Sequence, residues 1–147
     1  MTKEKIISAV SIFFLTLVFL AGCSGSKSTT GKVSQSSMIN SLSKELGMTK
    51  DQTEAGLGAM MMLSKNKLSP EDFTKLSKGI PGGSSSLINK ASDLGVVPGS
   101  VSTTADIISV LTKLGVSPVQ AAKFTGSVLK FAGGLGGSTL GLLSKVF

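Results

Sequence analysis

The sequence lacks histidine, arginine, tryptophan and tyrosine, and it has a single cysteine, Cys23. All 15 positive charges are lysines, and the only aromatic residues are seven phenylalanines. Without histidine or a second cysteine the usual ligands of zinc and most transition metals are missing, so we predict no metal site and no cofactor. A Ser–His or Cys–His nucleophile is excluded for the same reason.

The net charge of +7 favours an anionic partner. Nucleic-acid readers normally use arginine forks, with stacking aromatic residues where they bind single strands. The absence of both argues against nucleic acid. A solvated lysine surface accounts for the charge better. The partners that we expect are an envelope protein or an anionic lipid.

The N-terminus has the pattern of an export signal. Two lysines precede the uncharged apolar run Ile6–Leu20, whose 15 residues are too few for a comfortable transmembrane helix. Leu20-Ala21-Gly22-Cys23 follows and resembles the bacterial lipobox. The small residues at 21 and 22 let a peptidase reach the backbone, and the thiol at 23 forms a thioether to diacylglycerol. We therefore predict a signal peptide over residues 1–22, cleaved between Gly22 and Cys23.

The resemblance implies that Cys23 becomes an N-palmitoyl, S-diacylglycerol cysteine. An ordinary secretory signal ending near a cysteine is the alternative, but a lone cysteine in an exported chain needs a role, and lipidation supplies one. In double-membraned bacteria, Ser24 rather than Asp after the cysteine favours the outer membrane, facing the periplasm.

The segment after the lipobox is polar through Ser37. We predict a lipid-anchored flexible tether over residues 23–37, with a random-coil reach of roughly 20 Å.

Apolar residues recur at helical spacing from Met38 onward, which predicts an all-α multi-helix bundle over residues 38–147. Four expected helix starts have a residue suited to the N-cap position. They are Thr49 and Ser117, each with a glutamine three residues later, Ser69, which is followed by proline, and Thr103. Stops are expected at glycines, including the pair Gly133-Gly134. The expected helices are about 38–46, 50–66, 70–78, 86–94, 103–114, 117–132 and 138–147.

A repeat with an offset of 68 residues runs through this region. Leu46-Gly-Met-Thr-x-x-Gln52 corresponds to Leu114-Gly-Val-Ser-x-x-Gln120. Each copy has the pattern helix, tight turn, longer helix, short helix. Two copies are too few for a solenoid, so we predict a bundle of two similar three-helix halves. The alternative explanation is that both stretches use residues that commonly end one helix and start the next.

Three motifs taken together resemble the VcgC/VcgE-type domain of unknown function. They are Gln52-x-x-x-Gly56-x-Gly58, Leu68-Ser-Pro-x-Asp-Phe73 and Pro81-Gly82, within a resemblance that runs from about Leu42 to Phe147. The resemblance implies a helical exported bacterial domain, and it supplies no activity or catalytic residue.

Carboxylates are the remaining candidates for catalysis. Asp51 and Glu54 would share a helix face, whereas Glu71 and Asp72 diverge. Most acids fall near helix starts and most lysines near helix ends, where each complements the helix dipole, so we predict no enzyme activity. The glycine-rich run 133–137 is interpreted as a linker, and Met60–Met62 as core with at least one member exposed.

These patterns leave three hypotheses. The first is an outer-membrane lipoprotein whose helical domain has a non-catalytic interaction or structural role. The second is a membrane- or glycolipid-active helical protein that uses its lysine-rich helices. The third is a hydrolase that works through carboxylates alone.

Overall fold

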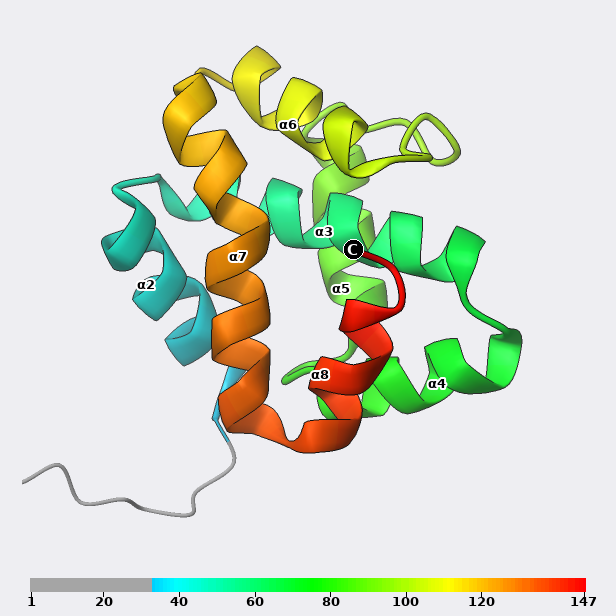
Figure 1. Ribbon diagram of the computed structural model, residues 1–147. Coiled ribbons are helices and arrows are strands. Elements are labelled where there is room, and N and C mark those ends of the chain that lie inside the picture. The colour runs from blue at the N-terminus through cyan, green and yellow to red at the C-terminus, as the bar shows by residue number, and fades with distance from the viewer. Residues whose placement is uncertain (1–32) are drawn as a thin grey trace, which may run out of the picture. The chain divides into compact units, whose positions relative to one another are not determined.

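All regular elements of the computed structural model, which describes residues 33–147, are helices (Figure 1). The all-α prediction is confirmed. The helices are α2 (Gln35–Leu46), α3 (Lys50–Lys67), α4 (Pro70–Gly79), α5 (Ser84–Asp93), α6 (Thr104–Lys113), α7 (Pro118–Leu135) and α8 (Gly137–Ser144).

Helix starts fall where the sequence supplies capping side chains. Thr49, Thr103 and Ser117 each form a complete capping box, and Ser69 accepts a hydrogen bond from the backbone N–H of Asp72 at 3.2 Å. These contacts satisfy N–H groups that lack a partner within the helix. All four predicted starts are confirmed.

Three predicted boundaries differ from the structure by three residues, and the start of α5 differs by two. Helix α2 begins at Gln35, because Ser34 caps it, so residues 35–37 are helical rather than part of a tether. Helix α7 continues through Gly133 and Gly134 and ends at Leu135, because the backbone turns at Gly136, whose φ is +135°. The predicted stop at 133–134 and the linker over 133–137 are therefore wrong. Helix α8 ends at Ser144 rather than at 147.

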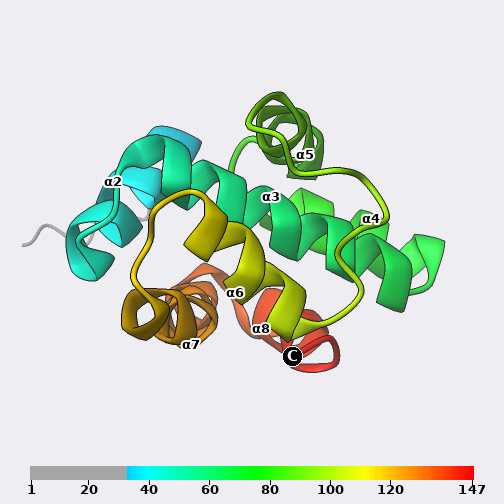
Figure 2. The same cartoon turned by 90° about the horizontal axis from the view of Figure 1, so that it is seen from above.

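Helix α3 forms the centre of the domain. Figure 2 shows it running between α5 on one side and α6, α7 and α8 on the other. All ten residues from Ala55 to Ser64 are buried. A helix that is buried all round carries no polar face, which accounts for the absence of charge in this stretch.

Two glycines allow neighbouring helices to approach α3 closely. A Cβ at Gly58 would collide with the carbonyl oxygen of Leu87 and with the Ala91 side chain, both on α5. A Cβ at Gly56 would lie 2.6 Å from Cζ of Phe124 on α7. Replacing the glycines would therefore push α5 and α7 away from the central helix.

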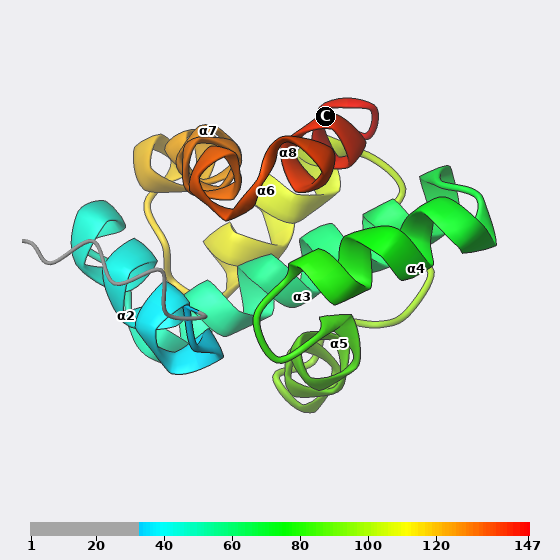
Figure 3. The same ribbon diagram turned by 90° about the horizontal axis from the view of Figure 1, so that it is seen from below.

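The structure contains the predicted two copies. Helices α2–α4 and α6–α8 have the same order, and the bounds of α3 and α7 differ by 68 residues at both ends. Helix α5 lies between the copies in sequence. The copies interlock, since α2 packs on α7, α6 packs on α3, and α4 packs on α8 (Figure 3).

A reciprocal pair of glutamines joins the copies. Gln52 donates from Nε2 to the carbonyl oxygen of Leu114 at 2.8 Å, and Gln120 donates to that of Leu46 at 2.9 Å. Each glutamine also accepts the N–H of its own capping residue through Oε1. One side chain thus caps the start of its own helix and the end of a helix in the other copy.

Candidate functional site

The predicted lipidation site, Cys23, and the cleavage position Gly22 lie outside the described residues. The described chain begins at Val33, ten residues after Cys23, and it enters α2 through the N-cap Ser34.

The structure brings Asp51 and Glu54 together through a lysine. Lys90 Nζ on α5 lies 3.4 Å from Asp51 Oδ1 and 3.9 Å from Glu54 Oε2. The Asp51 side chain is 67% exposed and that of Lys90 is 43% exposed, so solvent screens the ion pairs and they contribute at most about 1 kcal/mol each. This cluster links α3 to α5.

Glu71 and Asp72 have different surroundings. Asp72 lies 3.6 Å from Lys75 on its own helix and 3.6 Å from Lys145, just beyond α8. Glu71 is exposed. The Asp72 carboxylate therefore joins α4 to the C-terminal segment. The carboxylates of Glu71 and Asp72 do not face each other.

Asp106 completes the N-terminal cap of α6. The backbone N–H of Ser102, the Thr103 hydroxyl and the Thr103 backbone N–H donate hydrogen bonds to Asp106 Oδ2 at 2.8–2.9 Å. In that order of importance they lower the pKa of the carboxyl group below its ordinary value, because they favour its charged form.

The methionine triplet lies wholly in the core. Met60, Met61 and Met62 are at most 5% exposed. The prediction that one of them is exposed is wrong, because residues 55–64 of α3 are enclosed on every side instead of presenting one face to solvent. The triplet fills the core and forms no binding groove.

Residues 33–147 contain neither a metal-binding cluster of acidic side chains nor a membrane-spanning helix. No group of three or more Cys, Asp or Glu side chains in this part of the chain is placed to hold a metal ion. No helix in the same region is both long and apolar enough to cross a membrane.

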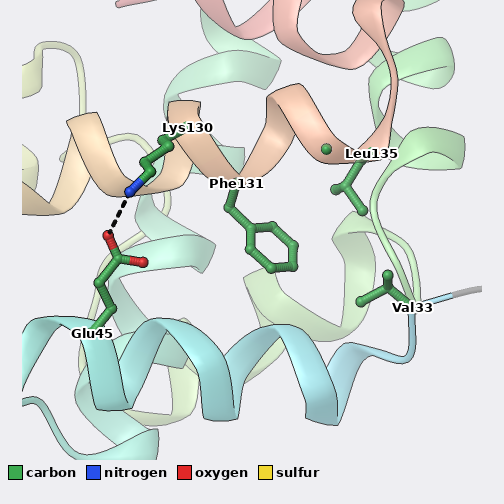
Figure 4. A pocket seen from close by; sticks show the side chains of 6 residues that line it. Val33, Glu45, Lys130, Phe131 and Leu135 are labelled. Atoms are coloured by element: carbon green, nitrogen blue, oxygen red, sulfur yellow. Dashed lines mark ion pairs between the residues drawn. The ribbon is translucent and has the colours of Figure 1, made fainter. Parts of the chain in front are cut away.

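A pocket of about 280 Å³ lies between α2 and the C-terminal part of α7 (Figure 4). Its apolar wall is formed by Val33, Phe131 and Leu135, with Gly134 beside them. Glu45 on α2 and Lys130 on α7 line it as well, and their charged groups are 3.9 Å apart. An apolar wall beside one exposed ion pair suits a nonpolar group with a polar end.

Sequence reasoning missed this pocket. The available signal was Phe131 and Leu135 on either side of a glycine pair, within a segment that we interpreted in part as a linker. Helical spacing places residues 131, 134 and 135 on one face, but only the tertiary structure shows that Val33 and α2 complete the pocket.

The comparisons give a family without a known activity. The family model described as "protein of unknown function VcgC/VcgE (DUF2780)" matches residues 21–105. The match begins before the expected Leu42 and ends in the first turn of α6, short of Phe147. No curated protein matches the chain, and no solved structure does.

The motifs that carried the resemblance have structural roles in this fold. Gln52 caps the end of α6, and Gly56 and Gly58 admit α7 and α5 against α3. Ser69 and Pro70 start α4, and Gly82, with φ at +78°, forms the turn before α5. The matched region covers more than half of the sequence, and the chain belongs to the VcgC/VcgE family of proteins of unknown function.

Proposed function

We propose that this protein is a bacterial lipoprotein that holds a small helical domain at a membrane surface. The observation that carries the proposal is the only cysteine of the sequence, placed directly after an apolar signal-like run and two small residues. The family match begins at residue 21 and so includes Cys23. The helical domain starts within about a dozen residues of that cysteine.

In this proposal a peptidase cleaves after Gly22, and Cys23 carries a thioether-linked diacylglycerol and an amide-linked acyl chain. Each buried methylene contributes about 0.8 kcal/mol, so two or three chains anchor stably where one does not. Ser24 directs the protein to the outer membrane of a double-membraned host, facing the periplasm.

The domain itself has a non-catalytic role in interaction or envelope structure, with an envelope protein or anionic lipid as partner. The charges support this role. The acidic groups that the structure pairs lie at helix starts or between helices, where they stabilise the fold. The membrane-active alternative has less support, since the exposed large apolar side chains of residues 33–147 are three valines, Val33, Val97 and Val119.

The test is Cys23→Ser in the native host, with Ser24→Ala as the matched control. We expect the control to incorporate labelled fatty acid and to stay with membranes after a high-salt wash, and the Cys23 variant to do neither. Fatty-acid labelling of Cys23→Ser would refute the proposal. Ser24→Asp tests the location, and an unchanged distribution between inner and outer membranes would refute the sorting step.

A further inference from the structure

We propose that the pocket between α2 and α7 binds a free single-chain amphiphile whose head group carries a phosphate and a primary ammonium, that is, a lysophosphatidylethanolamine. The acyl chain of this ligand lies against the apolar wall, and its head group meets the pair Glu45 and Lys130. Every residue that lines the pocket lies within residues 33–147. The inference therefore goes beyond the proposed function and does not depend on a lipid at Cys23.

The apolar part of the pocket fits a narrow chain better than a bulky group. Figure 4 shows Phe131 and Leu135 on the α7 side of the gap and Val33 across from them. The volume of about 280 Å³ is at the low end for ligand pockets. Val33 is 40% exposed, and a Cβ at Gly134 would meet no atom within 4 Å, so part of the wall is open to water. An acyl chain that displaces this water gains the free energy of apolar burial.

The ion pair at the edge of the pocket is loose. Lys130 Nζ and Glu45 Oε1 are 3.9 Å apart, which is too far for a direct hydrogen bond. The Ser127 hydroxyl donates to the same oxygen at 3.3 Å, so Glu45 keeps Oε2 for another donor, and the Lys130 ammonium keeps N–H groups for another acceptor. The Glu45 and Lys130 side chains are 46% and 81% exposed, so a ligand can reach both from solvent.

Two opposite charges side by side favour a head group that carries both signs. A phosphate beside Lys130 also lies close to the Glu45 carboxylate, which repels it, so a purely anionic head gains little. An ammonium two carbon atoms from the phosphate is attracted by the same carboxylate and donates a hydrogen bond to it. The phosphoethanolamine head has this arrangement, whereas a fatty acid or a phosphoglycerol head has negative charge alone. Charge complementarity therefore indicates the ligand class.

The first experiment tests the pocket. The chain from Ser24 to Phe147, which contains the whole compact unit Lys32–Phe147, is titrated with 14-carbon lysophosphatidylethanolamine below its micelle concentration. We expect saturable one-to-one binding, with NMR shift changes at the amides of Gly134 and Leu135. Val33→Asp places a charge in the apolar wall and should weaken this binding at least tenfold.

Val119→Asp is the matched control. Val33 directly precedes the N-cap of α2, and Val119 is in the first turn of α7, so an aspartate at either place complements a helix N-terminus. Both valines are exposed, but Val119 does not line the pocket, so we expect Val119→Asp to bind like the wild type. Absence of binding, or equal binding by the two variants, would overturn the site. A ligand-free dimer that Val33→Asp dissociates would also overturn it, because a second copy would then be the occupant.

The second experiment tests the head group. The wild type should bind lysophosphatidylethanolamine about fivefold more tightly than lysophosphatidylglycerol of the same chain length, as expected of one exposed ion pair. Glu45→Gln removes the carboxylate charge, so we expect most of this preference to disappear. Glu71→Gln is the matched control, since it neutralises an exposed carboxylate on α4, and it should retain the preference.

An unchanged preference in Glu45→Gln, or tighter binding of lysophosphatidylglycerol by the wild type, would overturn the assignment of the head group. Thermal unfolding shows that each variant is folded before its binding is compared with that of the wild type.

Discussion

Gln120 makes hydrogen bonds from both ends of its amide. Its Oε1 accepts from Ser117 within the capping box, while its Nε2 donates to the carbonyl oxygens of Leu46 and Gly47 in the other copy. Gln52 has the matching arrangement with Leu114. Capping boxes accept glutamate as readily as glutamine, so the amide group is required only for the contact between copies.

Gln120→Glu separates the two roles. The carboxylate keeps the capping acceptor but places negative charge against two carbonyl oxygens, so we expect a loss of about 1–3 kcal/mol in the free energy of unfolding. Chemical denaturation at pH 7 measures this loss. If the capping box alone mattered, the variant would be as stable as the wild type, and that result would contradict the contact between copies.

Asp106 predicts a pH dependence of stability. The pKa of Asp106 is lowered in the folded state. Its contribution to the free energy of unfolding is therefore present above the pKa of the unfolded state, about 3.9, and is lost as the pH falls through the pKa of the folded state. Asp106→Asn accepts the same donors without titrating. We expect the denaturation midpoint of the wild type to fall more steeply than that of the variant as the pH drops from 5 to 3. Parallel curves would contradict the capping role.

At the scale of elements, local signals predicted most helix boundaries. The starts at Thr49, Ser69, Thr103 and Ser117 depend on a side chain three residues from its partner, and such short-range contacts are visible in sequence. Helix α5 has Gly83 at its N-cap and no side-chain cap, and its start was predicted two residues late. The stop at Gly133-Gly134 failed because a glycine ends a helix only where the backbone actually turns.

Because α3 and α5 approach each other closely, we expect substitution by alanine to change stability in opposite directions at two glycines. At Gly126, alanine meets open space and should raise stability by up to about 1 kcal/mol through helix propensity. At Gly58, the added methyl collides with the backbone of α5, so alanine should lower stability by about 1–3 kcal/mol despite the same propensity gain. Thermal unfolding compares them, and stabilisation by Gly58→Ala would show that α5 does not cross there.

At the scale of the molecule, the two copies exchange contacts instead of forming separate halves. Helix α6 packs on α3 and α2 packs on α7, so each copy completes the core of the other. The repeat was visible in sequence, but the partner of each glutamine was not. A sequence offset predicts which residues are equivalent and does not predict how the copies face one another.

The connection between α5 and α6 should therefore be dispensable once the chain has folded. Val97 is 63% exposed and Gly99 has open space around it, so a protease site inserted after Gly99 is accessible. After cleavage we expect both fragments to co-elute in gel filtration and to separate only in denaturant. Separation in native buffer would contradict interlocking. The uncut protein with the same insertion is the control.

The two functional features differ in whether the sequence alone can reveal them. The proposed lipobox is a linear motif, so the resemblance of Leu20–Cys23 to it can be recognised without a fold. The pocket is lined by residues 33, 45, 130, 131, 134 and 135, which come together only when α2 packs on α7. The helix expected from the sequence ends at 132 and the expected linker includes Leu135, so the sequence could not show that Phe131 and Leu135 line a pocket together with Val33.

The most direct test of the anchoring account is the mass of the N-terminal peptide of the protein extracted from host membranes. The account predicts that the chain begins at Cys23 and carries a diacylglyceryl thioether, with a further acyl group on its amino nitrogen. A mature chain that begins at any other residue, or an unmodified Cys23, would contradict it.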